Sequence, residues 1–144
     1  MKITNRKAHF NYNILETMEV GIVLSGSEVK SVREGRVDFS DSFARVQGGE
    51  VFLKNMFIPP YKGGVPEGYN PKRDRKLLLH RKQIDELILK TSKASVTLVP
   101  ISIYQTRNMF KVELGVAQSK RQFDKRRAIK ARDEQRRIEQ EIKY

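Results

Sequence analysis

The chain has 144 residues and a mass of 16.7 kDa, contains no cysteine, and carries a formal net charge of +12 at pH 7. This length suits one domain with an extension and is too short for two domains. Without cysteine there is no disulfide, no thiolate nucleophile and no cysteine-based zinc site. There is also no 18-residue apolar run and no hydrophobic N-terminal stretch. We therefore expect a cytoplasmic protein with no membrane partner.

The positive charge is shared between two parts of the chain. The last 25 residues contain ten Lys or Arg and five Asp or Glu, which makes this segment +5 and leaves +7 on residues 1–119. Basicity over both parts favours an extended polyanionic partner over one small acidic ligand. RNA, DNA and an anionic membrane all meet that description, and the membrane is the weakest of them because the sequence offers no apolar segment to insert.

Taken in chain order, the first predicted elements are a strand and a short helix. Residues 19–24 are apolar and β-prone, which is typical of a buried strand. Ser25 and Glu28 have the spacing of a capping box, in which each side chain bonds to the other residue's backbone N–H. The helix that they begin should end at Gly35, a natural residue for the position after a helix.

A hairpin and a long loop come next. Residues 43–47 and 50–55 flank Gly48-Gly49, a two-residue turn signal between alternating strands. The segment 59–72 contains four prolines and three glycines, and we expect an irregular surface loop there.

The remaining elements are a buried apolar run, a helix and a second pair of strands. We expect residues 77–79 to be buried and residues 81–90 to form an amphipathic helix. Residues 95–104 and 109–116 should be strands joined by a short polar turn, and Pro100 marks an edge or a bulge. Most connections are too short for parallel crossovers. The chain is therefore predicted to be mainly β with short helices, an OB-like antiparallel barrel over residues 1–119.

The basic tail, residues 120–144, has few groups to bury. A segment this charged cannot offset its ordering entropy by packing on its own body. Its residues are good helix formers, and Asp133/Arg137 and Glu139/Lys143 are favourable i,i+4 pairs. We expect a tail that is disordered when free and helical when a polyanion neutralises it.

The N-terminus carries the clearest binding signal. Asn5-Arg6-Lys7 precedes Phe10 and Tyr12, which combines cations for phosphates with rings that can stack on bases. We expect Phe10 to belong to the core and leave Tyr12 open between core and stacking. A second charge run, residues 72–76, is interpreted as a solvated surface.

Glu19 is an acid on a basic protein, just before a predicted buried strand. Most such residues are salt-bridged or simply exposed. A carboxylate can also accept hydrogen bonds from the amino and imino groups of an exposed guanine, which phosphate binding alone never needs.

Catalytic signals are weak by comparison. The sequence has no G-x-S-x-G and no phosphate-cradling G-x-x-x-x-G-K-[ST] motif. Neither His9 nor His80 has a recognisable Ser or Asp partner, and the two are too far apart in sequence to suggest a metal site. We expect no enzyme activity, no catalytic residue, no cofactor and no metal.

Several blocks of the sequence, in order and over nearly the whole chain, resemble the SsrA-binding protein family, also called small protein B. The blocks are residues 5–8 with Tyr12, residues 19–22, residues 26–33, Pro71 with Arg73, residues 75–80, Val99-Pro100 with Tyr104, and Asp124-Lys125-Arg126 followed by Ile129-Lys130. Members of this family partner transfer-messenger RNA in bacterial ribosome rescue, also called trans-translation.

The resemblance implies a monomer that binds the tRNA-like domain of this RNA and delivers it to the ribosomal A site. The tail would occupy the 16S rRNA decoding centre and the empty mRNA channel. The residues expected to bind RNA are Asn5, Arg6, Lys7, Tyr12, Glu19, Phe43 and Lys111. The tail residues expected to bind the ribosome are Lys120, Arg121, Phe123, Asp124, Lys125, Arg126, Ile129, Lys130 and Arg132.

Two alternatives of different class remain open from the sequence. A ribosomal or initiation-type OB protein that binds rRNA constitutively would have the same charge and barrel. An RNA-modifying enzyme would share the basic surface but needs a catalytic constellation. Only the ordered blocks, above all those of the tail, argue against the first alternative.

The substitution Ile129→Pro tests the expected conditional helix. Proline inside a helix costs about 3 kcal/mol or more, whereas the i,i+4 pairs contribute only about 0.2 to 0.5 kcal/mol each. The variant should bind the RNA as tightly as the parent but lose ribosome rescue in a reconstituted translation assay. Full rescue by the proline variant would contradict the conditional helix.

Overall fold

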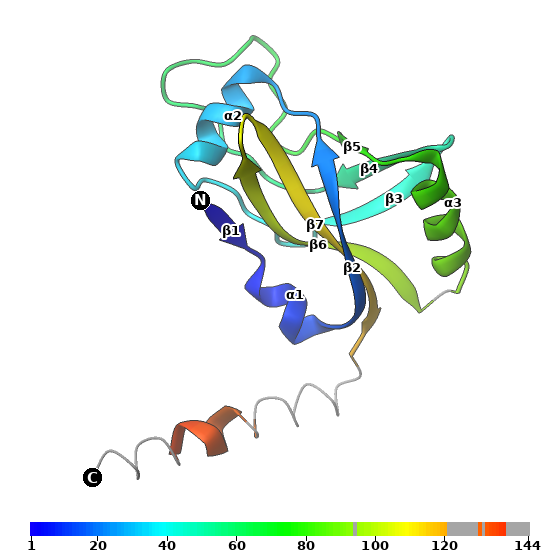
Figure 1. Cartoon of the computed structure of the whole chain (residues 1–144). Helices are drawn as coiled ribbons and strands as arrows, with labels where there is room; N and C mark the ends of the chain where they lie inside the picture. The colour runs from blue at the N-terminus through cyan, green and yellow to red at the C-terminus, as the bar shows by residue number, and fades with distance from the viewer. Residues whose placement is uncertain (94, 121–129, 131, 138–144) are drawn as a thin grey trace.

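The computed structural model describes residues 1–93, 95–120, 130 and 132–137 (Figure 1). Within the tail, Lys130 and residues 132–137 are helical and exposed. Lys120 is also described, whereas Arg121, Phe123, Asp124, Lys125, Arg126 and Ile129 lie outside the described residues. The expectation that the tail changes from disordered to helical on binding therefore stays a prediction.

The body is an antiparallel barrel, as predicted. Its strands are β1 (Lys2–Thr4), β2 (Tyr12–Ile22), β3 (Phe43–Gln47), β4 (Glu50–Lys54), β5 (Arg75–Leu78), β6 (Val96–Thr106) and β7 (Met109–Ser119). They pair in the order β1-β6-β3-β4-β5-β2-β7, and β6 also pairs with β7. That last pairing closes β2 to β7 into a barrel, which leaves β1 as an extra strand along β6.

Three helices lie on the outside of the barrel (Figure 1). They are α1 (Arg6–Asn11), α2 (Gly26–Arg33) and α3 (Arg81–Lys90). Val32 of α2 and Leu87 of α3 are fully buried in the main core, together with inward-facing residues of the strands. Ala8 of α1 instead packs on the outer side of β6 and β7, in a second small cluster. Part of the sheet is therefore buried on both faces.

The local turn and cap signals are confirmed. Ser25 begins α2 with a capping box to Glu28, and Gly35 follows the helix with φ +76°. Gly48 and Gly49 form the β3–β4 turn with φ values of +58° and +77°. These positive φ values are what glycine adopts without strain, so the residue type determines the chain reversal there.

Other expectations need correction. The strand predicted at 19–24 is β2, which begins at Tyr12 and ends at Ile22. Leu78 was expected to be buried but is 46% exposed, because β5 alternates its side chains between the two faces while Leu77 points inward. The N-terminal residues form β1 and α1, for which the sequence analysis predicted no regular structure.

A buried ion cluster joins α2 to β5 and to the long loop before it. Glu28 and Arg75 both have 0% of their side chains exposed, and Arg75 Nε donates to Glu28 Oε2 at 2.7 Å. Arg73 Nε donates to both oxygens of the same carboxylate at 3.1 Å. Arg75 also donates to the carbonyls of Met56 and Pro71. The interpretation of residues 72–76 as a solvated charge run is therefore wrong for Arg75, while Arg73 is partly exposed and paired with Glu28.

The protonation of Glu28 follows from this setting. Burial by itself would raise the pKa of Glu28, but hydrogen bonds from Arg73 and from the Ser25 N–H, together with the charge of Arg75, more than offset it. The pKa of Glu28 is thus lowered from its ordinary value, and the native state favours the carboxylate.

Among the described residues, no helix is long and apolar enough to span a membrane.

The substitution Glu28→Gln should destabilise the fold strongly. It leaves Arg75 buried without a counter-charge, and breaking such a pair costs about 3 to 5 kcal/mol. Urea unfolding should show this loss, whereas Glu86→Gln, an exposed acid on α3, should change the free energy of unfolding by less than about 0.5 kcal/mol. Equal stabilities of the two variants would contradict the role of the cluster.

The same cluster makes stability depend on pH. A lowered native pKa means that Glu28 stabilises the fold fully above the glutamate value in the unfolded chain, about 4.3. The contribution is lost as the pH falls through the lower native pKa. The difference in stability between parent and Glu28→Gln should therefore shrink as the pH falls from about 4.3 to the native pKa of Glu28, which urea unfolding at several pH values would measure.

Candidate nucleic-acid interface

A bulge in β6 shapes the surface near the N-terminus. The register between β6 and β7 shifts between Pro100 and Ser102, so of the two alternatives predicted at Pro100, an edge or a bulge, the structure has the bulge. The extra residue, Ile101, is buried against Gly115, where an added Cβ would lie 2.9 Å from Ile101 Cδ1. Glycine is needed there so that the bulged side chain can cross β7 towards Ile14.

Asn5 donates hydrogen bonds to two carbonyls at the bulge. Its side-chain Nδ2 donates to Pro100 O at 2.8 Å, and its backbone N–H donates to Ile101 O at 2.7 Å. Asn5 is 8% exposed. Asn5, which is predicted to bind RNA, therefore attaches the chain between β1 and α1 to β6.

The predicted RNA-binding residues in and after α1 differ in exposure. Arg6 and Lys7 are exposed, while Tyr12 is half-buried beside Ala8 in the second cluster. Asn5, Lys7 and Tyr12 line one groove of about 240 Å³ between α1 and the turn before β3. Phe10 was expected in the core but is 37% exposed, because α1 buries only Ala8 against the sheet.

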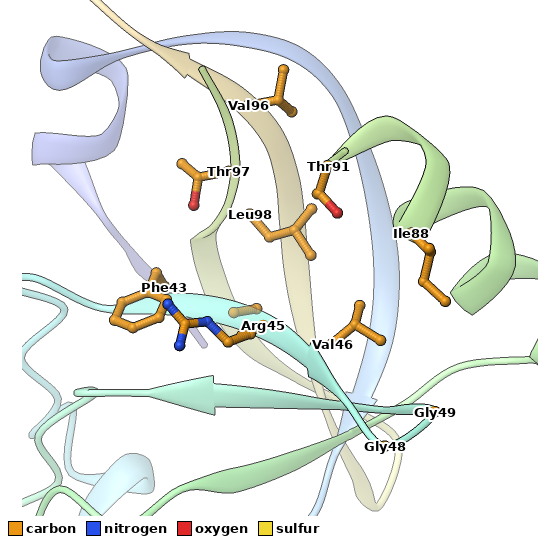
Figure 2. Close-up of a pocket in the computed structure, with 11 residues that line it drawn as sticks. Phe43, Arg45, Val46, Gly48, Gly49, Ile88, Thr91, Val96, Thr97 and Leu98 are labelled. Carbon is orange, nitrogen blue, oxygen red and sulfur yellow. The ribbon is translucent and has the colours of Figure 1, made fainter. Parts of the chain in front are cut away.

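Phe43 lies at the start of a second and larger groove. This groove has a volume of about 570 Å³ and lies between β3, α3 and β6. Figure 2 shows Phe43 and Arg45 together on β3, with Thr97 on β6 and Ile88 on α3 also lining the space. The Arg45 guanidinium lies 5.5 Å from the centroid of the Phe43 ring. Ser42, the residue before Phe43, lines the first groove.

Glu19 and Lys111 share the outer face of neighbouring strands. Glu19 pairs with Glu113 and Gly21 pairs with Lys111 across β2 and β7, so all four positions belong to one face. Glu19 is exposed and accepts a hydrogen bond from the hydroxyl of Tyr104 on β6. The pairing of β2 with β7 therefore places a hydrogen-bond acceptor, Glu19, near a cation, Lys111. A base edge needs such an acceptor, and a phosphate needs such a cation.

Lys120, the first residue of the tail, is bonded to α1. Lys120 N–H donates to Asn11 O at 2.9 Å, and Lys120 Nζ donates to His9 O at 3.0 Å. A cation at the C-terminal end of a helix also interacts favourably with its dipole. Lys120, predicted as a ribosome-binding residue, lies against α1 in this structure.

The predicted RNA-binding residues thus fall into two groups. Asn5, Lys7 and Tyr12 line the first groove with Phe43 beside it, while Glu19 and Lys111 lie on the outer face of β2 and β7. Tyr104, Lys2 and Arg45 were not among the RNA-binding residues predicted from the sequence. Alternation along β6 could have placed Tyr104 on the outer face, but its contact with Glu19 depends on strand order.

Within the part of the chain that the structure describes, no group of three or more His, Cys, Asp or Glu residues could hold a metal ion.

Comparison with known proteins gives consistent matches. The family model described as SmpB protein matches residues 2–144. An SsrA-binding protein of Geobacillus kaustophilus is 53% identical over 135 residues, which cover 94% of this chain and 87% of the relative. One of Mycolicibacterium smegmatis is 52% identical over 139 residues, with coverages of 96% and 86%.

A solved structure gives the corresponding match in three dimensions. It is described as "tmRNA-SmpB: a journey to the center of the bacterial ribosome". The similar chain is 46% identical in sequence, and the two superimpose with a TM-score of 0.72. The match covers 89% of this chain and 94% of the other.

The substitution Asn5→Ala should lower the stability of the body. Leaving the Pro100 carbonyl without its buried donor costs about 1 to 3 kcal/mol. Asn13→Ala, at an exposed position of β2, is the matched control and should be nearly neutral in urea unfolding. If Asn5→Ala unfolds at the same urea concentration as the control, Asn5 does not hold the bulge.

Proposed function

Since the chain belongs to the SmpB protein family, we propose that it binds transfer-messenger RNA and acts with it on the ribosome to rescue stalled translation. It is an RNA-binding factor of trans-translation. The observation that carries this proposal is a match that spans residues 2–144, barrel and tail together. A general OB-type RNA-binding protein would be expected to share only the barrel.

In more detail, we propose that the body binds the RNA and that the tail binds the ribosome. Residues 1–119 bind the tRNA-like domain, and residues 120–144 enter the decoding centre and the empty mRNA channel of the ribosomal A site. The segment 1–119 has net charge +7 and 120–144 has +5, so each part has the charge needed to approach RNA. Ile129→Pro is the variant that separates the two activities.

The chemistry proposed for the body combines phosphate and base contacts. Arg6 and Lys7 are exposed cations on α1, suited to phosphates. Glu19 accepts from the amino and imino groups of an exposed base, and Lys111 beside it neutralises phosphate. Phe43 supplies a ring for stacking, with Arg45 near its face.

We propose that the protein acts by binding alone, without catalysis, and that it does so in the cytoplasm, where bacterial ribosomes are found. The two rival functions make different predictions for the RNA that co-purifies with the chain. Sequencing that RNA should return transfer-messenger RNA above the level in a mock purification. Recovery of 16S or 23S rRNA alone would favour a constitutive ribosomal protein, and turnover of the RNA would favour an enzyme.

Glu19→Ala and Lys111→Ala should each weaken binding of the tRNA-like domain. Losing one charge-assisted hydrogen bond costs about 1.5 to 3 kcal/mol, on the order of tenfold or more in affinity. The melting temperature should change little, because Glu19 is exposed and Lys111 lies at the surface. Affinity and melting temperature are measured on the same preparations.

The matched controls are Glu67→Ala in the long loop and Lys82→Ala on α3, both exposed. They change the net charge by the same amount without touching the proposed face. If Lys82→Ala weakens binding as much as Lys111→Ala does, the effect of Lys111 is one of general charge. Glu67→Ala raises the net charge and should not weaken binding, so an equal loss for Glu67→Ala and Glu19→Ala would mean that the assignment of Glu19 is wrong.

A further inference from the structure

Tyr104 reaches across one strand to bind Glu19. Tyr104 belongs to β6 and Glu19 to β2, and β7 lies between them. Tyr104 pairs with Lys111 on β7, and Lys111 pairs with Gly21 on β2. Gly21 brings no side chain to the outer face of β2, and the nearest atoms to its missing Cβ belong to Leu78 of β5. The phenol hydroxyl therefore donates to the Glu19 carboxylate over a strand that neither residue belongs to.

The phenol ring is held from its other side by β1. Lys2 pairs with Tyr104 across β1 and β6, and its ammonium lies 5.9 Å from the ring centroid. The same ammonium is 4.0 Å from Glu113 Oε2, which also accepts from Ser102 Oγ at 3.2 Å. The ring thus lies between a cation–π contact at its face and a hydrogen bond at its hydroxyl.

These contacts restrict an exposed side chain. A glutamate on the surface of a strand normally samples several rotamers, and fixing it on binding costs conformational entropy. The Tyr104 hydroxyl bonds to Glu19 Oε2 and leaves Oε1 for other donors. Each carboxylate oxygen can accept two hydrogen bonds, so the bond to Tyr104 does not exhaust even Oε2.

We propose that Tyr104 is a positioning residue for RNA recognition: its hydroxyl holds the Glu19 carboxylate in the orientation that accepts the amino and imino groups of an exposed base. The proposal rests on the proposed function and on Glu19 as an RNA-binding residue. Tyr104 acts through Glu19, and Lys2 acts through Tyr104 by keeping the ring in place. Part of the ordering entropy of Glu19 is then lost before the RNA arrives.

The protonation of the phenol supports this role. Burial, the hydrogen bond to Glu19 and the negative charges of Glu19 and Glu113 raise the pKa of Tyr104 to about 12. The ordinary value is about 10. The hydroxyl therefore keeps its proton, and remains a donor, at neutral pH.

Tyr104→Phe is the direct test, because it removes the hydroxyl and keeps the ring that Lys2 covers. Affinity for a transcript of the tRNA-like domain should fall about two- to tenfold, the range expected for one side chain that is no longer pre-organised. The same substitution in a Glu19→Gln background should have much less effect, because the group that it positions has changed. An equal loss in both backgrounds would show that Tyr104 acts independently of Glu19 and would overturn the proposal.

Tyr69→Phe is the matched control. The Tyr69 hydroxyl donates to Ile58 O at 2.7 Å in the long loop, far along the chain from Glu19. This variant should lower the melting temperature and leave affinity unchanged. Tyr104→Phe should show the reverse, so a purely structural role for Tyr104 would appear as the Tyr69 pattern and would contradict the proposal.

A spectroscopic measurement needs no RNA. The phenol of Tyr104 is titrated by the ultraviolet absorbance difference between the parent chain and Tyr104→Phe. In the Glu19→Gln background, the pKa of Tyr104 should fall from about 12 towards its ordinary value, because a charged acceptor has been removed. A pKa that stays at about 12 would mean that the hydrogen bond does not form in solution.

The outcomes also separate this proposal from the proposed function. If Glu19→Ala loses affinity while Tyr104→Phe binds like the parent, Glu19 binds RNA without help and only the positioning role is wrong. If the parent chain binds the transcript no better than an unrelated RNA of equal length, the proposed function itself is wrong.

Discussion

The Glu28 carboxylate is the point to which the least regular part of this protein is attached. Twenty residues lie between β4 and β5, and they form neither helix nor strand. Arg75 donates to Met56 O near the start of this segment and to Pro71 O near its end, and Glu28 supplies the counter-charge that allows Arg75 to be buried. Because Glu28 belongs to α2, the same carboxylate attaches that helix to the barrel.

This arrangement pairs two cations of a strongly basic protein with one carboxylate. Arg73 and Arg75 add to the formal charge of +12, but both are committed to Glu28. A buried pair of this kind adds little net stability compared with apolar residues, yet it is costly to disrupt. Its physical effect is to select one conformation of the loop, since carbonyls at both of its ends accept from one rigid guanidinium.

A second device, the β6 bulge, separates the two surfaces that the proposed function uses. Ile101 turns outward, Gly115 leaves room for it, and Asn5 donates to the carbonyl of Pro100. On one side of the bulge the outer face is covered by α1, which forms the first groove. On the other side it is polar, with the buried Ser102 and the half-buried Tyr104 of β6 beside the half-buried Glu113 of β7. The outer face of β6 thus changes from apolar to polar at one irregular residue.

The sequence by itself determined the local geometry and the general kind of partner. The Ser25–Glu28 cap and the Gly48-Gly49 turn depend on backbone conformations and hydrogen bonds within a few residues, so residue type was enough to predict them. At Pro100, residue type reduced the choice to an edge or a bulge. The excess of positive charge and its division between body and tail are likewise properties of composition. The tertiary structure alone decided which charges are buried and which side chains meet. Arg75 and Lys76 are neighbours in sequence, but strand alternation and the position of α2 bury only Arg75. Tyr104 and Glu19 are 85 residues apart and meet because the barrel places β7 between their strands, an outcome of strand order that no local pattern encodes.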